Sequence, residues 1–198
     1  MIYKMGTDLT DNELKQWAPC CWYLLHILAF KMKNGEIQKP AKCLELFQSL
    51  GNILPCPKCQ KHFKEYYKKN KITKDTNLVT WTNRYHNDVN RLTNKPLLTD
   101  KDIRNLFYVD DDIPIDHKKI HLMLRIFHIF HHEEGNPKEF NKFLRLLRKV
   151  FPCNTCKIEL KENKEDGFKK FLKIVSGKIC QEEKNSASAI SKQKFTIS

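Results

Sequence analysis

The chain has 198 residues, of which 40% are hydrophobic and 30% are charged, and its formal net charge is +13 at pH 7. This is long and apolar enough for one well-packed core with a smaller appendage, which argues against disorder throughout. The lysines and arginines are spread over polar helix faces and do not form one block with aromatic residues, so nucleic-acid binding is not expected.

Two observations bear on location. The most apolar stretches, WYLLHILAF and IHLMLRIFHIF, contain histidine and are roughly ten residues long, well short of the ~20 residues that a membrane span requires. The N-terminal stretch lacks a long apolar region, so we expect neither a membrane span nor a secretory signal. Without a signal, the 8 cysteines are more often catalytic or metal-binding than structural.

Apolar residues recur at helical spacing almost everywhere, and the alternation typical of strands is rare. The pattern predicts an all-α fold, with helices at 11–28, 40–53, 58–69, 75–92, 99–108, 118–131, 137–150 and 168–175. The acidic, proline-containing stretch Val109–Asp116 resembles a boundary. We therefore predict a domain at 1–110, a smaller helical domain at 111–180 and a disordered tail at 181–198.

The second half of the chain repeats features of the first. An apolar helix with a central histidine (WYLLHILAF; LRIFHIF) precedes a second helix (CLELFQSLGNIL; FLRLLRKVF). In both halves the second helix runs into Pro-Cys-x-x-Cys and a further helix, although the spacing between the histidine and the cysteines differs. The pattern indicates a decayed duplication.

The first Cys-x-x-Cys pair, Cys56 and Cys59, lies at a predicted helix start. The helix dipole lowers the pKa of a thiol there, and the spacing allows either a reducible disulfide or a shared metal ion. A zinc site needs two further ligands, for which His62, Cys153 and Cys156 are candidates. The motif alone leaves both chemistries open.

Polar side chains gather beside an aromatic residue on the helix at 75–92. His86 and Asn90 share a helix face with Trp81 or Val89, and Asn87 lies next to that face. This mixture of donors and acceptors suits a bound ring system that has both edges and faces. For any single residue, a buried histidine–asparagine bond would be the simpler interpretation.

The first helix carries a comparable set, Trp17, Trp22 and His26. The three side chains are at helical spacing, so they could equally be core residues. Together with the other motifs, however, they form the pattern W-x4-W-x3-H, then C-x-x-C about thirty residues later, then H-N-x-V-N followed by Lys-Pro. This pattern, over roughly residues 11–108, resembles the Erv/ALR family of FAD-linked sulfhydryl oxidases, and within it the short forms encoded by large cytoplasmic DNA viruses.

The resemblance implies a four-helix bundle with a short fifth helix, which holds FAD in its core and usually forms a homodimer. It implies a thiol oxidase that makes disulfides in protein substrates and passes electrons through FAD to O2, giving H2O2. Cys56 and Cys59 would form the active disulfide, with Cys59 against the flavin as the charge-transfer thiolate and Cys56 attacked by incoming thiols. The residues that match the family's FAD contacts are Trp17, Trp22, His26, Trp81, His86, Asn87, Val89, Asn90 and Lys95.

The chain departs from the family pattern in places. Ala18 and Pro19 stand where a glycine and often an arginine are usual, which puts that flavin contact in doubt. Asn83 stands where many cellular members have a cysteine, so their structural disulfide to the fifth helix is absent. If the protein is viral, we expect it in the host cytoplasm or the virion, with a thioredoxin-like viral redox protein as one candidate partner.

The remaining cysteines have several interpretations. Cys153 and Cys156 could be a shuttle disulfide that hands electrons to the first pair, a structural relict of the duplication, or metal ligands. A bond between the adjacent Cys20 and Cys21 would be strained, and Cys21 is expected in the core. Cys43 and Cys180 have no assigned role. The competing functional class is a zinc-stabilised helical adaptor without enzyme activity.

Overall fold

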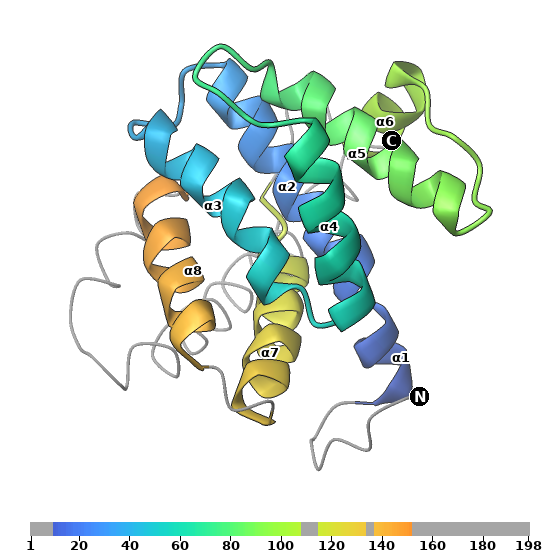
Figure 1. Cartoon of the computed structure of the whole chain (residues 1–198), viewed down its shortest axis with the longest axis vertical. Coiled ribbons are helices and arrows are strands. Elements are labelled where there is room, and N and C mark those ends of the chain that lie inside the picture. Colours follow the sequence, from blue (N-terminus) through green and yellow to red (C-terminus); the bar gives the residue numbers. More distant parts are fainter. Residues whose placement is uncertain (1–9, 108–114, 134–136, 152–198) are drawn as a thin grey trace, which may run out of the picture.

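The computed structural model describes residues 10–107, 115–133 and 137–151, and within these residues it contains helices and no strands (Figure 1). The predicted all-α fold is confirmed. The helices are α1 (Asp11–Lys15), α2 (Trp17–Lys33), α3 (Pro40–Ile53), α4 (Pro57–Lys69), α5 (Leu78–Leu92), α6 (Asp100–Phe107), α7 (His117–Glu133) and α8 (Pro137–Val150). The helix predicted at 168–175 and the predicted tail lie outside the described residues.

Helix boundaries follow local chemistry. The helix predicted from residue 11 is interrupted at Gln16, because Pro19 has no N–H for the carbonyl of Lys15 and its ring crowds that carbonyl. The helix predicted from residue 75 begins at Leu78, because the side chain of Asn77 caps it by accepting a hydrogen bond from the Thr80 N–H at 3.1 Å.

The two C-terminal helices lie antiparallel to the first two long ones. Trp17 near the start of α2 packs on Phe127 of α7, with ring centroids 6.3 Å apart, while Tyr23 accepts a hydrogen bond from the Asp116 N–H just before α7. Asn52 at the end of α3 donates to Glu139 at the start of α8 at 3.2 Å. In Figure 1, α3 accordingly lies between α8 and α4.

One hydrophobic cluster unites these helices. It contains buried side chains of α2, α3, α4, α5, α7 and α8, among them Phe47, Phe63, Phe127 and Phe143, each at most 1% exposed. The described helices on both sides of residue 110 therefore share one core, and the domain boundary at 110–111 stays a prediction. None of the described helices combines the length and apolarity needed to cross a membrane.

Candidate active site

Cys56 and Cys59 are joined as a disulfide at the N-terminus of α4. Cys56 is the N-cap residue, Pro57 occupies the first helical position, and the Cys59 N–H donates to Cys56 Sγ at 3.1 Å. Both cysteines are half-buried. The pair thus lies at a helix start, as the sequence predicts, where the partial positive charge of the helix end favours a thiolate.

The turn that carries the disulfide is held from three sides. The Gln60 side chain donates to the Leu54 carbonyl at 2.8 Å, and the His131 ring, from α7, donates from Nε2 to the Ile53 carbonyl at 2.9 Å. Gly51 lets α4 approach α3 closely, because a Cβ atom there would lie 3.0 Å from Lys64 Cγ. These contacts fix the direction in which α4 presents its first turn.

Cys59 forms part of the wall of a predominantly apolar cavity of about 230 Å³ between α2, α3, α4 and α5. Cys56 is not among the residues that line it. The structure thereby brings together residues that are distant in sequence, namely Trp17, Trp22, Leu50, Cys59 and Val89. Three of these are predicted FAD contacts.

Beside the cavity, Trp22 and two histidines form an aromatic group. The rings of Trp22 and His86 are stacked, with centroids 4.0 Å apart and planes 7° apart. His86 Nδ1 and His26 Nε2 are 3.1 Å apart, so one imidazole donates its N–H to the other. Phe107 stacks on the far side of His26, at 4.4 Å.

Both histidines are buried and are uncharged near neutral pH. Burial lowers the pKa of His26 to about 3, with a further contribution from His86. Burial also lowers the pKa of His86 to about 4, and the charge of Lys95 acts in the same direction. The group is therefore a neutral aromatic surface with polar edges.

The two asparagines of the predicted set hold the segment after α5. Asn87 donates to the Leu98 carbonyl and accepts from the Leu98 N–H, both at 2.8 Å, and Asn90 donates to the Pro96 carbonyl at 3.0 Å. Asn94 turns the chain with a positive φ of 53°, and Lys95 is exposed. The predicted cofactor contacts of these residues stay predictions, because the asparagine side chains have backbone partners.

Trp81 lies away from the cavity. Its indole N–H donates to the Asn70 carbonyl at 2.7 Å, and its ring packs among Phe47, Phe63 and Tyr66. Since Trp81 is 6% exposed and does not line the cavity, its described contacts are those of a core residue, and its predicted contact with FAD stays a prediction.

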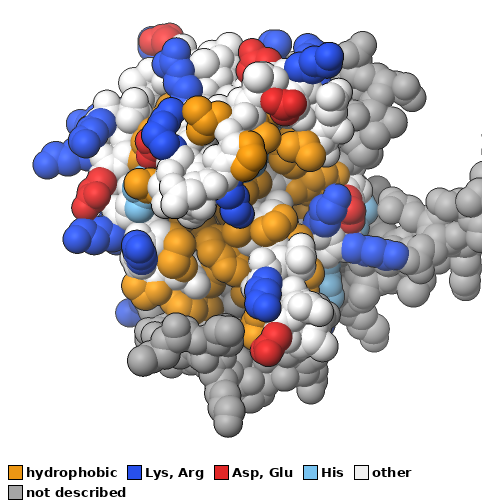
Figure 2. Space-filling model, turned by 90° about the vertical axis from the view of Figure 1, so that its right-hand side faces the viewer, with side chains coloured by type: hydrophobic (Ala, Val, Ile, Leu, Met, Phe, Trp, Pro, Cys, Tyr) orange, Lys and Arg blue, Asp and Glu red, His pale blue; other side chains and the backbone are white. Residues whose placement is uncertain are grey.

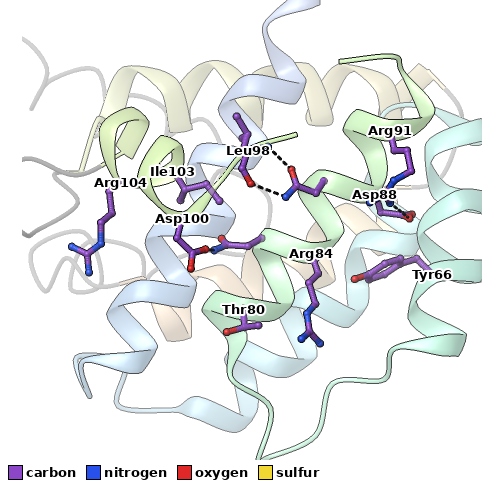
Figure 3. A pocket seen from close by; sticks show the side chains of 11 residues that line it. Tyr66, Thr80, Arg84, Asp88, Arg91, Leu98, Asp100, Ile103 and Arg104 are labelled. Carbon is purple, nitrogen blue, oxygen red and sulfur yellow. Dashed lines mark hydrogen bonds and ion pairs between the residues drawn. The ribbon is translucent and has the colours of Figure 1, made fainter. Parts of the chain in front are cut away.

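The opposite face of α5 borders a polar pocket of about 540 Å³, which was not predicted from the sequence (Figure 3). Its charged lining residues are Arg84, Asp88, Arg91, Asp100 and Arg104. Figure 3 shows Asp88 and Arg91 together near Tyr66, and their side chains are 3.6 Å apart. From the same carboxylate, Oδ2 lies 2.9 Å from Nε2 of His62.

His62, which the sequence suggested only as a candidate zinc ligand, has a different setting among the described residues. It lines the apolar cavity together with Cys59. The signal was its position three residues after Cys59 on the same helix face. Among the described residues, no group of three or more histidine, cysteine or acidic side chains could hold a metal ion.

Three further cysteines, Cys20, Cys21 and Cys43, are buried free thiols. Cys21 belongs to the core cluster, as predicted, and also lines the cavity. Burial raises the pKa of Cys21 and of Cys43 to about 12. Cys153, Cys156 and Cys180, with the roles predicted for them, lie outside the described residues.

Comparison with known proteins agrees with this geometry. Residues 19–108 match the model of the Erv1 / Alr family. An FAD-linked sulfhydryl oxidase of African swine fever virus is 27% identical over 94 residues, which cover 46% of this chain and 79% of the relative. A probable FAD-linked sulfhydryl oxidase of Acanthamoeba polyphaga mimivirus is 31% identical over 91 residues, covering 43% and 64%.

A plant protein, the FAD-linked sulfhydryl oxidase ERV1 of Oryza sativa subsp. japonica, is 30% identical over 95 residues, covering 46% of this chain and 47% of the relative. No solved structure matches the chain significantly. The matched segment runs from α2 to the end of α6 and contains the disulfide, the cavity and the histidine pair. Over residues 19–108, the chain is therefore similar to the Erv1/Alr family.

Proposed function

We propose that the protein is an FAD-dependent thiol oxidase that forms disulfides in protein substrates. The observation that carries the proposal is the position of the Cys56–Cys59 disulfide, with Cys59 in the wall of an aromatic-lined apolar cavity. All three relatives described above bear the name FAD-linked sulfhydryl oxidase.

The two cysteines have different surroundings, and this supports different roles. Cys59 lines the cavity, whereas Cys56 caps the helix outside it. A substrate thiolate attacks Cys56 and forms a mixed disulfide, so that Cys59 leaves as the thiol or thiolate. A second substrate thiol then attacks the substrate sulfur of the mixed disulfide, which releases the substrate disulfide and leaves both protein cysteines reduced.

The residues of the cavity fit a flavin. Its apolar walls, with Trp17 and Trp22, suit a flat ring system, and Cys59 would be the sulfur nearest to it. FAD, when bound, supplies the electron acceptor for the thiolate and delivers the electrons to O2, giving H2O2. Trp22 and His86, which stack on each other, would contribute an aromatic surface beside the bound group.

The net charge of the chain supports protein substrates of acidic character. Figure 2 shows hydrophobic side chains gathered across one face of the molecule, with lysines and arginines around them. A net charge of +13 favours encounter with acidic proteins. Our proposal includes a homodimer, Cys153 and Cys156 as shuttle or relict, a thioredoxin-like viral redox protein as one candidate substrate, and the host cytoplasm or virion as location.

The test is spectroscopic and kinetic. Purified full-length protein is expected to be yellow, with a flavin spectrum, and to consume O2 and release H2O2 when given dithiothreitol. Cys59→Ser is expected to abolish turnover. Cys43→Ala, which removes a buried thiol that does not line the cavity, is the matched control and should keep it.

A colourless protein that contains stoichiometric zinc would overturn the proposal and favour the zinc-stabilised adaptor. Nothing in the described residues favours that alternative, because Cys56 and Cys59 are bonded to each other and His62 is bonded to Asp88.

A further inference from the structure

The apolar cavity and the polar pocket lie on opposite faces of α5, and one hydrogen bond connects them. His62 lines the cavity and Asp88 lines the polar pocket. The distance between His62 Nε2 and Asp88 Oδ2 is 2.9 Å. The exposed fractions of the two side chains, 23% and 33%, show that both also reach solvent.

The direction of this hydrogen bond sets the tautomer of the ring. A carboxylate oxygen accepts this hydrogen bond when Nε2 of His62 carries the hydrogen, and that tautomer leaves the ring's lone pair on Nδ1. Tyr85 stacks on the ring, with centroids 5.9 Å apart, and limits its rotation. Nδ1 is thus a proton acceptor on a ring that belongs to the wall of the cavity.

Few other groups in the cavity can accept a proton at neutral pH. Its acid–base lining residues are Cys21, Lys58, Cys59, His62 and Tyr85. Burial raises the pKa of Cys21 to about 12 and also raises the pKa of Tyr85, so both groups keep their protons at neutral pH. On the outer side, Arg91 faces Asp88.

We infer that His62 accepts the proton of the Cys59 thiol, and that Asp88 positions the ring and stabilises the imidazolium that forms. The inference rests on the proposed function, since it assigns a proton acceptor to the same disulfide centre. His62 is then a catalytic residue and Asp88 a positioning residue.

The step is a proton transfer without a change in electron count. When a substrate dithiol has reduced the Cys56–Cys59 bond, both cysteines carry thiols. The S–H bond of Cys59 breaks and an N–H bond forms at Nδ1 of His62. The products are a Cys59 thiolate and an imidazolium paired with the Asp88 carboxylate. The sulfur of Cys59 keeps the electron pair of the broken S–H bond, and this makes the thiolate the reactive form of the cysteine.

The experiment measures the Cys59 thiolate directly, in full-length reduced protein without turnover. The rate of iodoacetamide alkylation is followed from pH 5 to 9 by mass spectrometry. Trypsin cuts after Lys58, so Cys56 and Cys59 are read on separate peptides. Because a neighbouring cation lowers a thiol pKa by roughly 1–3 units, His62→Gln should slow Cys59 alkylation at pH 7 about tenfold or more.

Asp88→Asn should shift the Cys59 profile in the same direction by less, since the ring stays but its imidazolium loses the carboxylate. Asp100→Asn is the matched control: it removes a carboxylate from the same polar pocket, where Asp100 bonds Asn83 and not His62. This control should leave the profile unchanged. Thermal unfolding of each variant verifies its fold.

Two results would overturn the inference: a wild-type Cys59 profile in His62→Gln, or a shift that occurs in Lys58→Gln and not in His62→Gln. The alkylation assay needs no flavin. A protein that fails to bind FAD but shows the His62-dependent profile would sink the proposed function and leave the proton acceptor in place. Protein that binds flavin but has a Cys59 profile independent of His62 would support the proposed function and overturn the role of His62 as proton acceptor.

Discussion

The helix pairs α2–α3 and α7–α8 share a sequence pattern, but they have different surroundings. Each pair has an apolar helix with a central histidine, and each leads into Pro-Cys-x-x-Cys. In the described part of the chain, α2 and α3 pack against α4, α5 and α6 as well as against the other pair, whereas the main partners of α7 and α8 are α2, α3 and each other. A helix pair of this pattern therefore does not form the cavity by itself; the cavity also needs α4 and α5.

The two central histidines illustrate the difference. His26 in α2 is 3% exposed and bonds His86 of α5. His128 in α7 is half-buried and lies beside Phe140, with centroids 5.6 Å apart. The first pair differs because it packs against α5. Val89 of α5 lines the apolar cavity, His86 contacts Trp22 and His26, and Asp88 lines the polar pocket. The described side chains of α7 and α8 contribute to the shared hydrophobic core.

The largest expected effect comes from breaking the shared core. Phe127→Ala removes a side chain that is 0% exposed and contacts both Trp17 and Phe143, so it should lower the free energy of unfolding by about 3–5 kcal/mol. Denaturant unfolding followed by fluorescence and by circular dichroism measures it. Both signals should shift together, because the two pairs unfold as one unit.

Leu106→Ala serves as the control, because Leu106 is 60% exposed and its loss should change stability by less than about 0.5 kcal/mol. If Phe127→Ala instead produced two separate transitions, the predicted boundary at 110–111 would mark independently folding units.

Acid should destabilise the contact between α2 and α5 through His26 and His86. In the folded state the pKa values of His26 and His86 are about 3 and 4, against 6.5 for the unfolded chain, so the unfolded state binds more protons between these values. Stability is therefore complete above about pH 6.5 and falls as the pH drops, by at most about 1.4 kcal/mol per pH unit for each ring. Denaturant unfolding at a series of pH values measures this slope.

His86→Gln sharpens this prediction. It keeps a polar partner for His26 and removes one titrating ring, so the slope between pH 6.5 and 5 should decrease. An unchanged slope in this variant would assign the acid sensitivity to other groups.

A smaller effect is expected at residues 96–98, whose backbone bonds to Asn87 and Asn90 of α5. Asn87→Ala removes two hydrogen bonds to Leu98 and should lower the free energy of unfolding by about 1–3 kcal/mol. The FAD content of the purified variant distinguishes the two roles of this residue. Loss of stability with full flavin content identifies an anchor of the segment; loss of flavin at unchanged stability would identify a direct contact.

The smallest effect should come from the polar link between the pairs. Asn52→Ala removes the exposed hydrogen bond to Glu139 and should change the free energy of unfolding by less than about 0.5 kcal/mol. A larger loss in thermal or denaturant unfolding would mean that polar contacts, and not the apolar core, hold α8 to α3.

Helical periodicity predicted the fold class and, at α3 and α8, the helix bounds, because proline marks both starts and apolar residues repeat at regular spacing. It also predicted the position of the disulfide at a helix start. Periodicity could not predict which side of α5 each polar residue uses. Asn87 and Asn90 turn to the backbone of residues 96–98, and Trp81 finds the Asn70 carbonyl, through contacts that depend on the path of a loop. The same holds for His62 and Asp88, which are paired only by the packing of α4 on α5.

The buried thiols matter for the integrity of the protein itself. The proposed activity would expose the protein's own cysteines to oxidation, and Cys21 shares a cavity wall with Cys59. Burial raises the pKa of Cys21 to about 12, so Cys21 stays a thiol at neutral pH and attacks a disulfide poorly. The raised pKa depends on burial, so it protects Cys21 only in the folded protein. In the unfolded chain burial no longer raises the pKa of Cys20, Cys21 and Cys43, so the proposed activity would oxidise them more readily before folding than after it.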